Sequence, residues 1–391
     1  MSRSPAFDAR LLGGLSPAAF LKTHWQRRPL LIRGAVTHLD RLPDRAALGA
    51  LASRDDVESR LVKRVDGQWS MEQGPFERLP RSRHDWTLLV QGVNLHDTAA
   101  DALMRRFDFV STMRLDDLMI SYAADGGGVG PHLDSYDVFL LQVEGRRRWR
   151  WRDQRSVTLR ERALVEGVPL KLLRHFTPTD EALLEPGDML YLPPSCAHEG
   201  TAVGACTTAS IGFRAPSWNE LSQEFLFTMA ERTWPDGRHA DAGREPTRSP
   251  GAIDAAMLSA IERRLSTIRW TARDIEIFVG RHFSEPKAHV SFDPPPPMSP
   301  GAFARRAAKH GLVLDPRTTL LHRGANGYIV GESFTLPTGC RAAYRRFADR
   351  RRVDAVAVAV MLDDPRSRAL LHTWWSDGWI HFAQGVCDGA P

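Results

Sequence analysis

A histidine and an aspartate two positions apart, inside a strand-forming segment, constrain the fold of this chain more than any other feature. The segment follows a glycine-rich turn at 126–130 and reads PHLDSYDVFLLQV. Side chains at positions i and i+2 of a strand point to the same face, so His132 and Asp134 can reach one ion together. Short apolar runs on either side, LMISY (118–122) and MLYL (189–192), predict buried strands. We therefore expect a β-rich domain that closes around this pair.

His198 is the candidate for a third metal ligand. An imidazole and a carboxylate on one face suit a divalent metal of borderline hardness, and a 2-His-1-carboxylate triad needs one further histidine from a neighbouring strand. His198 follows the predicted strand 189–192 and a double-proline loop, which can return the chain to the adjacent edge of a small barrel. The sequence therefore predicts a metal site formed by His132, Asp134 and His198.

Two glycine spacings indicate the type of barrel. Five residues separate Gly126 from His132, and five separate Gly187 from Pro193. This repeats the arrangement found in the second half of cupin barrels, except that Ser195 stands where those barrels usually have glycine. A lone His-x-Asp is a weak signal. Together with both glycine spacings and the third histidine, it favours a metal-binding barrel over an unrelated structural role.

Arginines alternate with tryptophans after Glu144-Gly145, a dipeptide that predicts a hairpin turn. If the chain continues as a strand, one face carries Arg147, Trp149 and Trp151, and the other carries the arginines at 146, 148, 150 and 152. Tryptophan favours the core, so the first face is expected inside the barrel, with Arg147 buried. The outward arginines are expected to form a basic stripe near the mouth, suited to phosphate or an acidic partner.

The predicted burial of Arg147 requires an anion, because an unpaired charge inside a barrel is costly. Either an internal aspartate or glutamate pairs with this guanidinium, or a bound anion does. A dicarboxylate gripped bidentately meets the requirement. 2-Oxoglutarate is the expected guest, since its keto-acid end would chelate iron at the predicted metal site while its distal carboxylate meets Arg147.

Length and composition indicate a modular globular protein. The 391 residues exceed one hydrophobic core, and about 150 residues per domain gives two or three domains. The N-terminus has no apolar signal region, and no segment approaches the roughly 20 apolar residues that cross a bilayer. We expect a cytoplasmic protein without membrane contact. The net charge of +5 comes mostly from arginine, which either a GC-rich genome or an RNA-rich partner explains, so direct nucleic-acid binding stays open.

The pattern becomes helical after Pro216. Helices are predicted at 219–234 and 254–269, and the second carries an apolar stripe of Met257, Ile261, Leu265 and Ile268. That stripe packs either on its own domain or in a dimer interface. The prolines at 294–297 then mark a stiff linker.

The last segment contains the elements of a winged helix. A helix (AFARRAAKHG), a hairpin with Asn326-Gly327 at its tip, a basic helix (CRAAYRRFADRRR), an alanine- and valine-rich helix and a closing hairpin (WWSDGWIHF) are predicted in that order. Such folds often bind nucleic acid. The basic helix is also explained as a solvated face, which we favour slightly.

The chain resembles the bacterial ribosomal oxygenases of the jumonji-C class. The resemblance is dense in the N-terminal half, and beyond Pro216 it persists only as a similar layout. Its motifs are HWQRRP (24–29), SRLV (59–62), DGQW (66–69), GPFE (74–77), WTLLVQGVN (86–94), DDLMISY (116–122), GGGVGPHLDSYDVF (126–139), GRRRWR (145–150), LEPGDMLYLPP (184–194), HEG (198–200) and SIGFRAP (210–216).

This resemblance implies an α+β fold with three modules. They are a double-stranded β-helix barrel of the jumonji-C/cupin type (1–215), a helical dimerisation region (216–293) and a winged-helix-like domain (298–391). It implies that His132, Asp134 and His198 hold Fe(II), and that Arg147 binds the C5 carboxylate of 2-oxoglutarate. It further implies a homodimer that hydroxylates Cβ of an arginine in a large-subunit ribosomal protein.

Three residues near the predicted triad are candidates for binding the substrate arginine. Asp125 and Asp137 could pair with its guanidinium, and Tyr136 could stack on it; each also has a structural explanation. The alternatives are hydroxylation of a histidine in another ribosomal protein, hydroxylation of RNA, and a non-enzymatic cupin regulator whose winged module binds DNA. A regulator needs neither the intact His-x-Asp nor the cofactor arginine together, so the sequence favours a hydroxylase.

Overall fold

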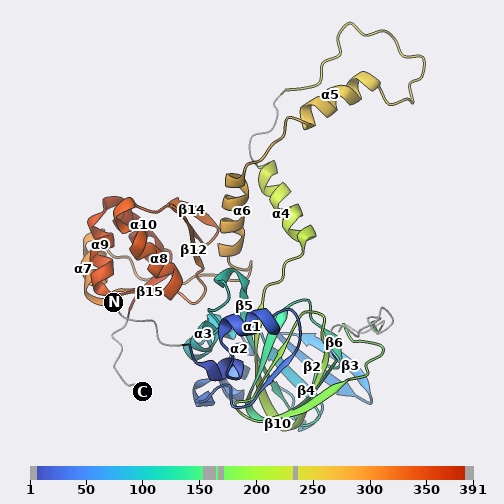
Figure 1. The fold of residues 1–391 in the computed structure, drawn as a ribbon, viewed down its shortest axis with the longest axis vertical. Coiled ribbons are helices and arrows are strands. Elements are labelled where there is room, and N and C mark those ends of the chain that lie inside the picture. The colour runs from blue at the N-terminus through green and yellow to red at the C-terminus, as the bar shows by residue number, and fades with distance from the viewer. Residues whose placement is uncertain (1–6, 153–163, 166–170, 232–236, 384–391) are drawn as a thin grey trace. The chain divides into compact units, whose positions relative to one another are not determined.

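A computed structural model describes residues 7–152, 164–165, 171–231 and 237–383 (Figure 1). The chain divides after Ala215 into two compact units. The first comprises Met1–Ala215 with His289–Ser291, and the second comprises Pro216–Ala288 with Phe292–Pro391. Each unit has its own hydrophobic core, as expected for a chain of this length.

The first unit is built on a 10-stranded antiparallel sheet that curls into a double-stranded β-helix barrel (Figure 1). The strands follow the order β1-β9-β7-β10-β5-β4-β2-β3, with β6 paired to β10 and β8 paired to β7. Their bounds are β1 (Leu30–Ile32), β2 (Ser59–Val65), β3 (Gln68–Gln73), β4 (Trp86–Val90), β5 (Leu115–Ala123), β6 (His132–Leu133), β7 (Asp137–Arg152), β8 (Asp180–Leu184), β9 (Met189–Leu192) and β10 (Ala197–Phe213).

Three helices, α1 (Pro17–Thr23), α2 (Arg45–Ala52) and α3 (Thr98–Arg105), belong to the same unit. α1 begins at Pro17, because the Ser16 hydroxyl accepts a hydrogen bond from the Ala19 N–H and proline is well suited to the first helical position. The core between helices and sheet is aromatic: Phe20 of α1 packs against Phe139 and Tyr191. This layer covers the outer face of the sheet and leaves the inner face for the site.

The hairpin predicted at Glu144-Gly145 is wrong, because β7 runs without a turn from Asp137 to Arg152. Gly145 has a left-handed φ of 64° and lies at a bulge, where three residues of β10 (204–206) stand opposite it. A Cβ on Gly145 would lie 2.2 Å from the carbonyl oxygen of Ala205. The glycine therefore allows the two long strands to bend together, which a sequence pattern does not distinguish from a turn.

The second unit contains seven described helices and six described short strands. The helices are α4 (Trp218–Ala230), α5 (Ala255–Leu265), α6 (Ala272–Ser284), α7 (Pro300–His310), α8 (Arg341–Arg350), α9 (Ala355–Asp363) and α10 (Pro365–Ser376). The strands are β11 (Leu312–Leu314), β12 (Leu320–Arg323), β13 (Asn326–Ile329), β14 (Glu332–Thr335), β15 (Arg352–Val353) and β16 (Ile380–Phe382). They form two sheets, β15-β11-β16 and β12-β13-β14, the second of which is the wing.

The two helices predicted after Pro216 are present, although positions 232–234 of the first prediction lie outside the described residues. The apolar stripe of α5 stays exposed: Met257 is 44%, Ile261 42% and Leu265 61% accessible. No residue of α4 or α5 is buried. These helices therefore present apolar side chains to solvent within the described chain. No helix of the described residues is long and apolar enough to span a bilayer.

α6 is a helix that the sequence pattern did not predict. It packs on the wing, where the Glu276 carboxylate accepts hydrogen bonds from the Tyr328 hydroxyl and the Asn326 amide. Arg281 also donates to the carbonyl oxygen of Gly331. Phe278 and Phe283 of the same helix are buried, and Ile275 and Phe278 recur at helical spacing, so an apolar stripe was present in the sequence.

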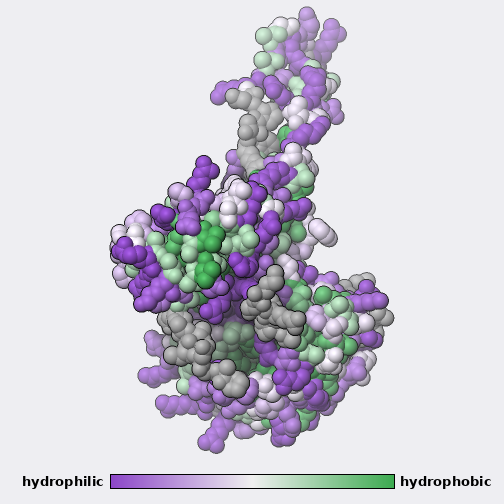
Figure 2. All heavy atoms as spheres, turned by 60° about the vertical axis from the view of Figure 1, so that its left-hand side comes forward, coloured by the Kyte–Doolittle hydropathy of each residue, from purple (hydrophilic) through white to green (hydrophobic). Residues whose placement is uncertain are grey.

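Two details of the winged-helix prediction are wrong. The wing turns at Gly324-Ala325, since Arg323 pairs with Asn326, so Asn326 already begins β13. The closing hairpin is instead the end of α10 followed by β16: Trp374 and Trp375 belong to the helix. β16 pairs with β11, far away in sequence. Figure 2 shows hydrophobic side chains gathered on one face of this unit, whose exposed apolar residues include Val356 and Val360 of α9.

Gly145→Ala is expected to lower the stability of the first unit by about 2 kcal/mol or more, since the new methyl meets a carbonyl oxygen at a left-handed position. Gly204→Ala is the matched control: its φ is also positive, but no atom lies within 4 Å of the added Cβ. It should cost about 1 kcal/mol. Scanning calorimetry of both variants measures the difference, and equal losses would contradict the role of Gly145 in the bend.

Candidate metal and cofactor site

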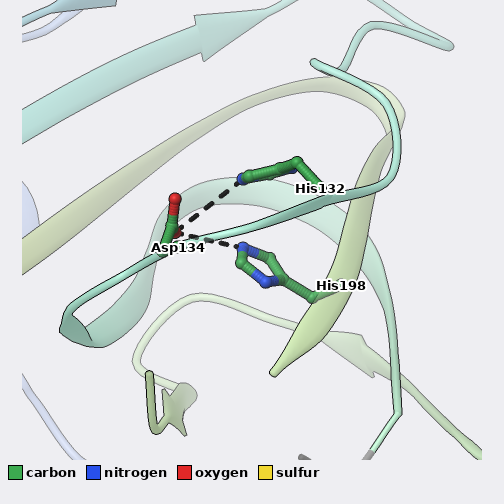
Figure 3. Close-up of side chains that lie close together, drawn as sticks. All are labelled: His132, Asp134 and His198. Atoms are coloured by element: carbon green, nitrogen blue, oxygen red, sulfur yellow. Dashed lines mark ion pairs between the residues drawn. The ribbon is translucent and has the colours of Figure 1, made fainter. Parts of the chain in front are cut away.

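The three predicted metal ligands lie together at one end of the barrel (Figure 3). His132 on β6 pairs directly with His198 on β10, which places both rings side by side, with centroids 4.2 Å apart. Asp134 follows β6, and its Oδ2 lies 3.8 Å from His132 Nε2 and 3.5 Å from His198 Nε2. One ligand atom from each residue falls within 4.8 Å of the others. The spacing fits a single ion held by three side chains.

Backbone carbonyls orient both imidazoles. His132 Nδ1 lies 2.9 Å from the carbonyl oxygen of Gly130, and His198 Nδ1 lies 2.9 Å from that of Cys196. Because a carbonyl can only accept, each Nδ1 carries the proton and donates it. In the neutral imidazole, Nε2, which faces Asp134, is then the nitrogen whose lone pair can bind a metal. The same two-residue offset recurs at both histidines.

Burial keeps His198 neutral. Desolvation, reinforced by the neighbouring His132, lowers the pKa of His198 to about 4, although Asp134 acts in the opposite direction. The imidazole is thus a neutral donor at physiological pH, the form that coordinates metals. Ser195, three residues earlier, adopts a φ of 62°, the left-handed conformation that glycine takes more easily. Ser195 therefore adopts the left-handed backbone conformation that would suit the glycine usually found at this position of cupin barrels.

A cavity of about 170 Å³ adjoins the three ligands inside the barrel. Three cationic side chains line it, Arg60, Arg147 and Lys171, whereas Asp134 is its one carboxylate. The inner faces of the strands supply the other walls, namely Val62, Thr87, Leu89, Met119, Ser121, Val138, Leu140, Trp149 and Ser210, together with Val129, Tyr136 and Leu172. The charge of the lining suits an anionic guest.

Arg147 is buried, as the alternation of arginine and tryptophan predicted. It is 5% accessible, and Trp149 and Trp151 share its buried face, whereas Arg146 and Arg148 are exposed. Its Nε and Nη2 atoms are buried without a hydrogen-bond partner. Among the described residues no carboxylate forms an ion pair with this guanidinium. A buried, unsatisfied guanidinium fits the expected carboxylate of a bound cofactor.

The outward arginines of β7 are partly neutralised by neighbouring acids. Arg148 lies 3.3 Å from Glu181, and Arg150 pairs with Glu199 on β10. Both carboxylates reduce the net charge of the predicted basic stripe, and its attraction for phosphate is correspondingly smaller.

The structure separates the three predicted substrate residues. Tyr136 lines the cavity and is 38% accessible, so it is placed as expected. Asp125 does not line the cavity: it lies 3.5 Å from His84 and accepts a hydrogen bond from the Gly204 N–H at 2.7 Å. This geometry fits the loop role that the sequence left open for it.

Asp137 is fully buried on the other side of β7. Its carboxylate accepts hydrogen bonds from the Tyr191 hydroxyl at 2.6 Å, from Gln26 at 3.1 Å and from Arg114 at 3.3 Å. Burial raises its pKa in spite of these bonds. Because Asp137 is fully buried and both of its oxygens accept hydrogen bonds from protein donors, it ties the N-terminal segment to the barrel and cannot meet a substrate at the mouth.

Sequence reasoning missed Asp117. Met119 and Ser121 line the cavity from β5, and Asp117 lies on the same face of that strand because side chains alternate. The pKa of Tyr136 is raised, mainly by burial and then by the negative charges of Asp134 and Asp117. The alternation in the DDLMISY motif was the available signal, but it needed the knowledge of which face is inside.

Comparison with known proteins gives a consistent result. The JmjC domain family matches residues 102–221, and the ROXA-like winged helix family matches residues 267–381. The "Ribosomal protein uL16 3-hydroxylase" of Escherichia coli K12 is 34% identical over 369 residues, covering 93% of this chain and 96% of that protein. A "Probable ribosomal oxygenase" of Haemophilus influenzae is 35% identical over 234 residues, 56% of this chain and 55% of its own.

A solved structure extends the similarity to three dimensions. YcfD, described as a ribosomal oxygenase from Escherichia coli in complex with cobalt and 2-oxoglutarate, superposes with a TM-score of 0.80 at 31% identity. The match covers 95% of this chain and 99% of that one. Barrel, helical region and winged helix therefore all have counterparts in one solved protein.

Proposed function

Because this chain belongs to the JmjC family of ribosomal oxygenases, we propose that it is an Fe(II)- and 2-oxoglutarate-dependent hydroxylase of a ribosomal protein, acting at Cβ of an arginine. The relative that spans most of the chain carries the name of a uL16 3-hydroxylase, and position 3 of an amino acid is Cβ. The observation that carries the proposal is the convergence of three ligands beside a buried arginine without a protein anion.

His132, Asp134 and His198 are the proposed ligands of Fe(II). Two neutral imidazoles and one carboxylate leave part of the coordination sphere open for cofactor and oxygen. When bound, iron and 2-oxoglutarate supply the oxidant that converts a substrate C–H bond into C–OH. The protein fixes the ligand atoms through the two carbonyl contacts at Nδ1 and excludes water through the apolar walls of the cavity.

Arg147 is the proposed partner of the distal carboxylate of 2-oxoglutarate. Its two buried, unpaired nitrogens would each gain a charge-assisted hydrogen bond, which removes the cost of their desolvation. The cationic lining of the cavity favours a doubly charged acid over a neutral guest.

Asp117 and Tyr136 are the proposed contacts of the substrate arginine. Asp117 lies on the face of β5 that carries Met119 and Ser121. It does not itself line the cavity, and its Oδ2 accepts a hydrogen bond from the Gly92 N–H at 3.2 Å, but its charge acts on the half-exposed Tyr136. A guanidinium entering there would meet a carboxylate and an aromatic ring. Asp125 and Asp137 are directed elsewhere.

The helical region supports the proposed homodimer. Its exposed apolar residues include Trp218 and Phe227 on α4 and Ile261 and Leu265 on α5, an amount of apolar surface that soluble monomers rarely present. We also propose that the winged-helix module begins before α6, since that helix packs on the wing and the winged-helix family match begins at residue 267. This moves the predicted boundary near 293 to a position before α6, while the boundary near 215 and the cytoplasmic location remain part of the proposal.

The reaction itself is tested by incubating the purified protein with Fe(II), 2-oxoglutarate and ribosomal-protein peptides. A peptide arginine is expected to gain the mass of one oxygen atom while succinate forms. Asp134→Ala should abolish both metal retention and turnover, because two histidines alone hold iron weakly. Modification of a histidine or of RNA would identify the alternative hydroxylases, and binding without succinate formation would identify a regulator.

Asp117→Asn is expected to raise the KM for the peptide about tenfold, since one charge-assisted hydrogen bond to the guanidinium is lost. The KM for 2-oxoglutarate should not change. Asp125→Asn is the matched control, because it also removes one carboxylate near the site and should leave both constants as they are. An effect confined to the Asp125 variant would restore the assignment that the sequence suggested.

Analytical ultracentrifugation tests the dimer. The chain of 43.8 kDa should sediment with twice that mass at micromolar concentration. The double variant Ile261→Asp with Leu265→Asp places two charges on the α5 stripe and should shift the species to the monomer. A wild-type monomer at these concentrations would contradict the proposed interface.

A further inference from the structure

The indole nitrogen of Trp149 is a buried donor that the site described above leaves unused. Nε1 is shielded from solvent and has no hydrogen-bond partner among the described residues, and the side chain as a whole is 5% accessible. A buried tryptophan N–H normally finds an acceptor, because leaving it unsatisfied costs free energy. Trp149 lines the same cavity as Arg147, whose Cζ lies 5.7 Å from the indole centroid.

Gly200 fixes which edge of the indole points away from the neighbouring strand. It stands directly opposite Trp149 in the pairing of β7 with β10. A Cβ at this position would lie 2.7 Å from both Cη2 and Cζ3 of the indole. The benzene edge of the ring therefore rests on bare backbone. Nε1 belongs to the opposite side of the indole and is directed away from Gly200.

We infer that Trp149 is a second cofactor-binding residue, whose indole N–H donates a hydrogen bond to the distal carboxylate of 2-oxoglutarate beside Arg147. The inference rests on the proposed function and deepens it. A carboxylate offers about four acceptor positions and a bidentate guanidinium occupies two, so a further donor can be accommodated. Gly200 is a positioning residue, since it admits the ring without touching the cofactor.

A packing role alone does not account for the arrangement. Trp151, two residues later on the same face, is 8% accessible and belongs to the same apolar cluster, yet it is not among the residues that line the cavity. The two tryptophans differ in that Trp149 lines the cavity and lies next to the Arg147 guanidinium. Among the described residues, the buried donors without a partner that line this cavity are two nitrogens of Arg147, Nε1 of Trp149 and Nε of Arg60, and the Trp149 indole lies beside Arg147.

Calorimetric titration of the full-length, cobalt-loaded protein with 2-oxoglutarate tests the inference without turnover. Trp149→Phe keeps an aromatic ring but removes the N–H, and is expected to weaken binding about tenfold. Arg147→Met should weaken it more, and Trp151→Phe should not change it. 2-Oxobutanoate, which lacks the distal carboxylate, should bind wild type and Trp149→Phe equally.

These titrations distinguish a failure of the proposed function from a failure of the proposed role of Trp149. Wild-type protein that does not bind 2-oxoglutarate at all would refute the proposed function. Wild-type binding with an unchanged Trp149→Phe variant, or an equal loss for 2-oxobutanoate, would refute the role of the indole alone. Gly200→Ala retains the N–H but displaces the ring, and should show the same selective loss; it replaces Trp149→Phe if that variant does not fold.

Discussion

The pairing of β7 with β10 is the constraint on which the site depends. These two strands hydrogen-bond in two runs separated by the bulge opposite Gly145, so each contributes to both sides of the barrel. His198 is carried by β10, and Arg147 and Trp149 are carried by β7. A slip of one residue would turn every side chain of a strand to the opposite face, placing Arg147 in solvent and Arg148 in the core. The backbone ladder thus fixes both the metal ligands and the cofactor contacts.

Within this frame, hydrogen bonds rather than charges define the state of each group. One backbone carbonyl accepts a hydrogen bond from Nδ1 of each ligand histidine, and burial keeps His198 neutral. Asp137 shows the contrasting case of a buried acid whose oxygens are all committed to protein donors. Within the described chain, two nitrogens of Arg147 have no such partner. The contrast between a satisfied and an unsatisfied buried charge separates a structural ion from one reserved for a ligand.

Local patterns were enough to predict the metal ligands and the buried face of β7, because each depends on periodicity or on neighbours within a few residues. The bulge at Gly145 could not be distinguished from a turn, since a glycine with positive φ serves both. α6 was not predicted although its apolar side chains Ile275 and Phe278 recur at helical spacing. Asp117 and the pairing of Trp149 with Gly200 required knowing which strands are neighbours, and no spacing within one segment encodes that.

The distribution of charge explains how one cavity can receive two ligands of opposite sign. Its inner wall is cationic and buried at Arg147, whereas Asp117 and Tyr136 lie toward the half-exposed side. An anionic cofactor is therefore stabilised deep in the barrel, where the dielectric is low and its pairing with Arg147 is strongest. Once bound, it offsets the positive charge that would otherwise repel a substrate guanidinium. If Asp117 and Tyr136 bind the substrate as proposed, the electrostatics favour binding of the cofactor before the arginine.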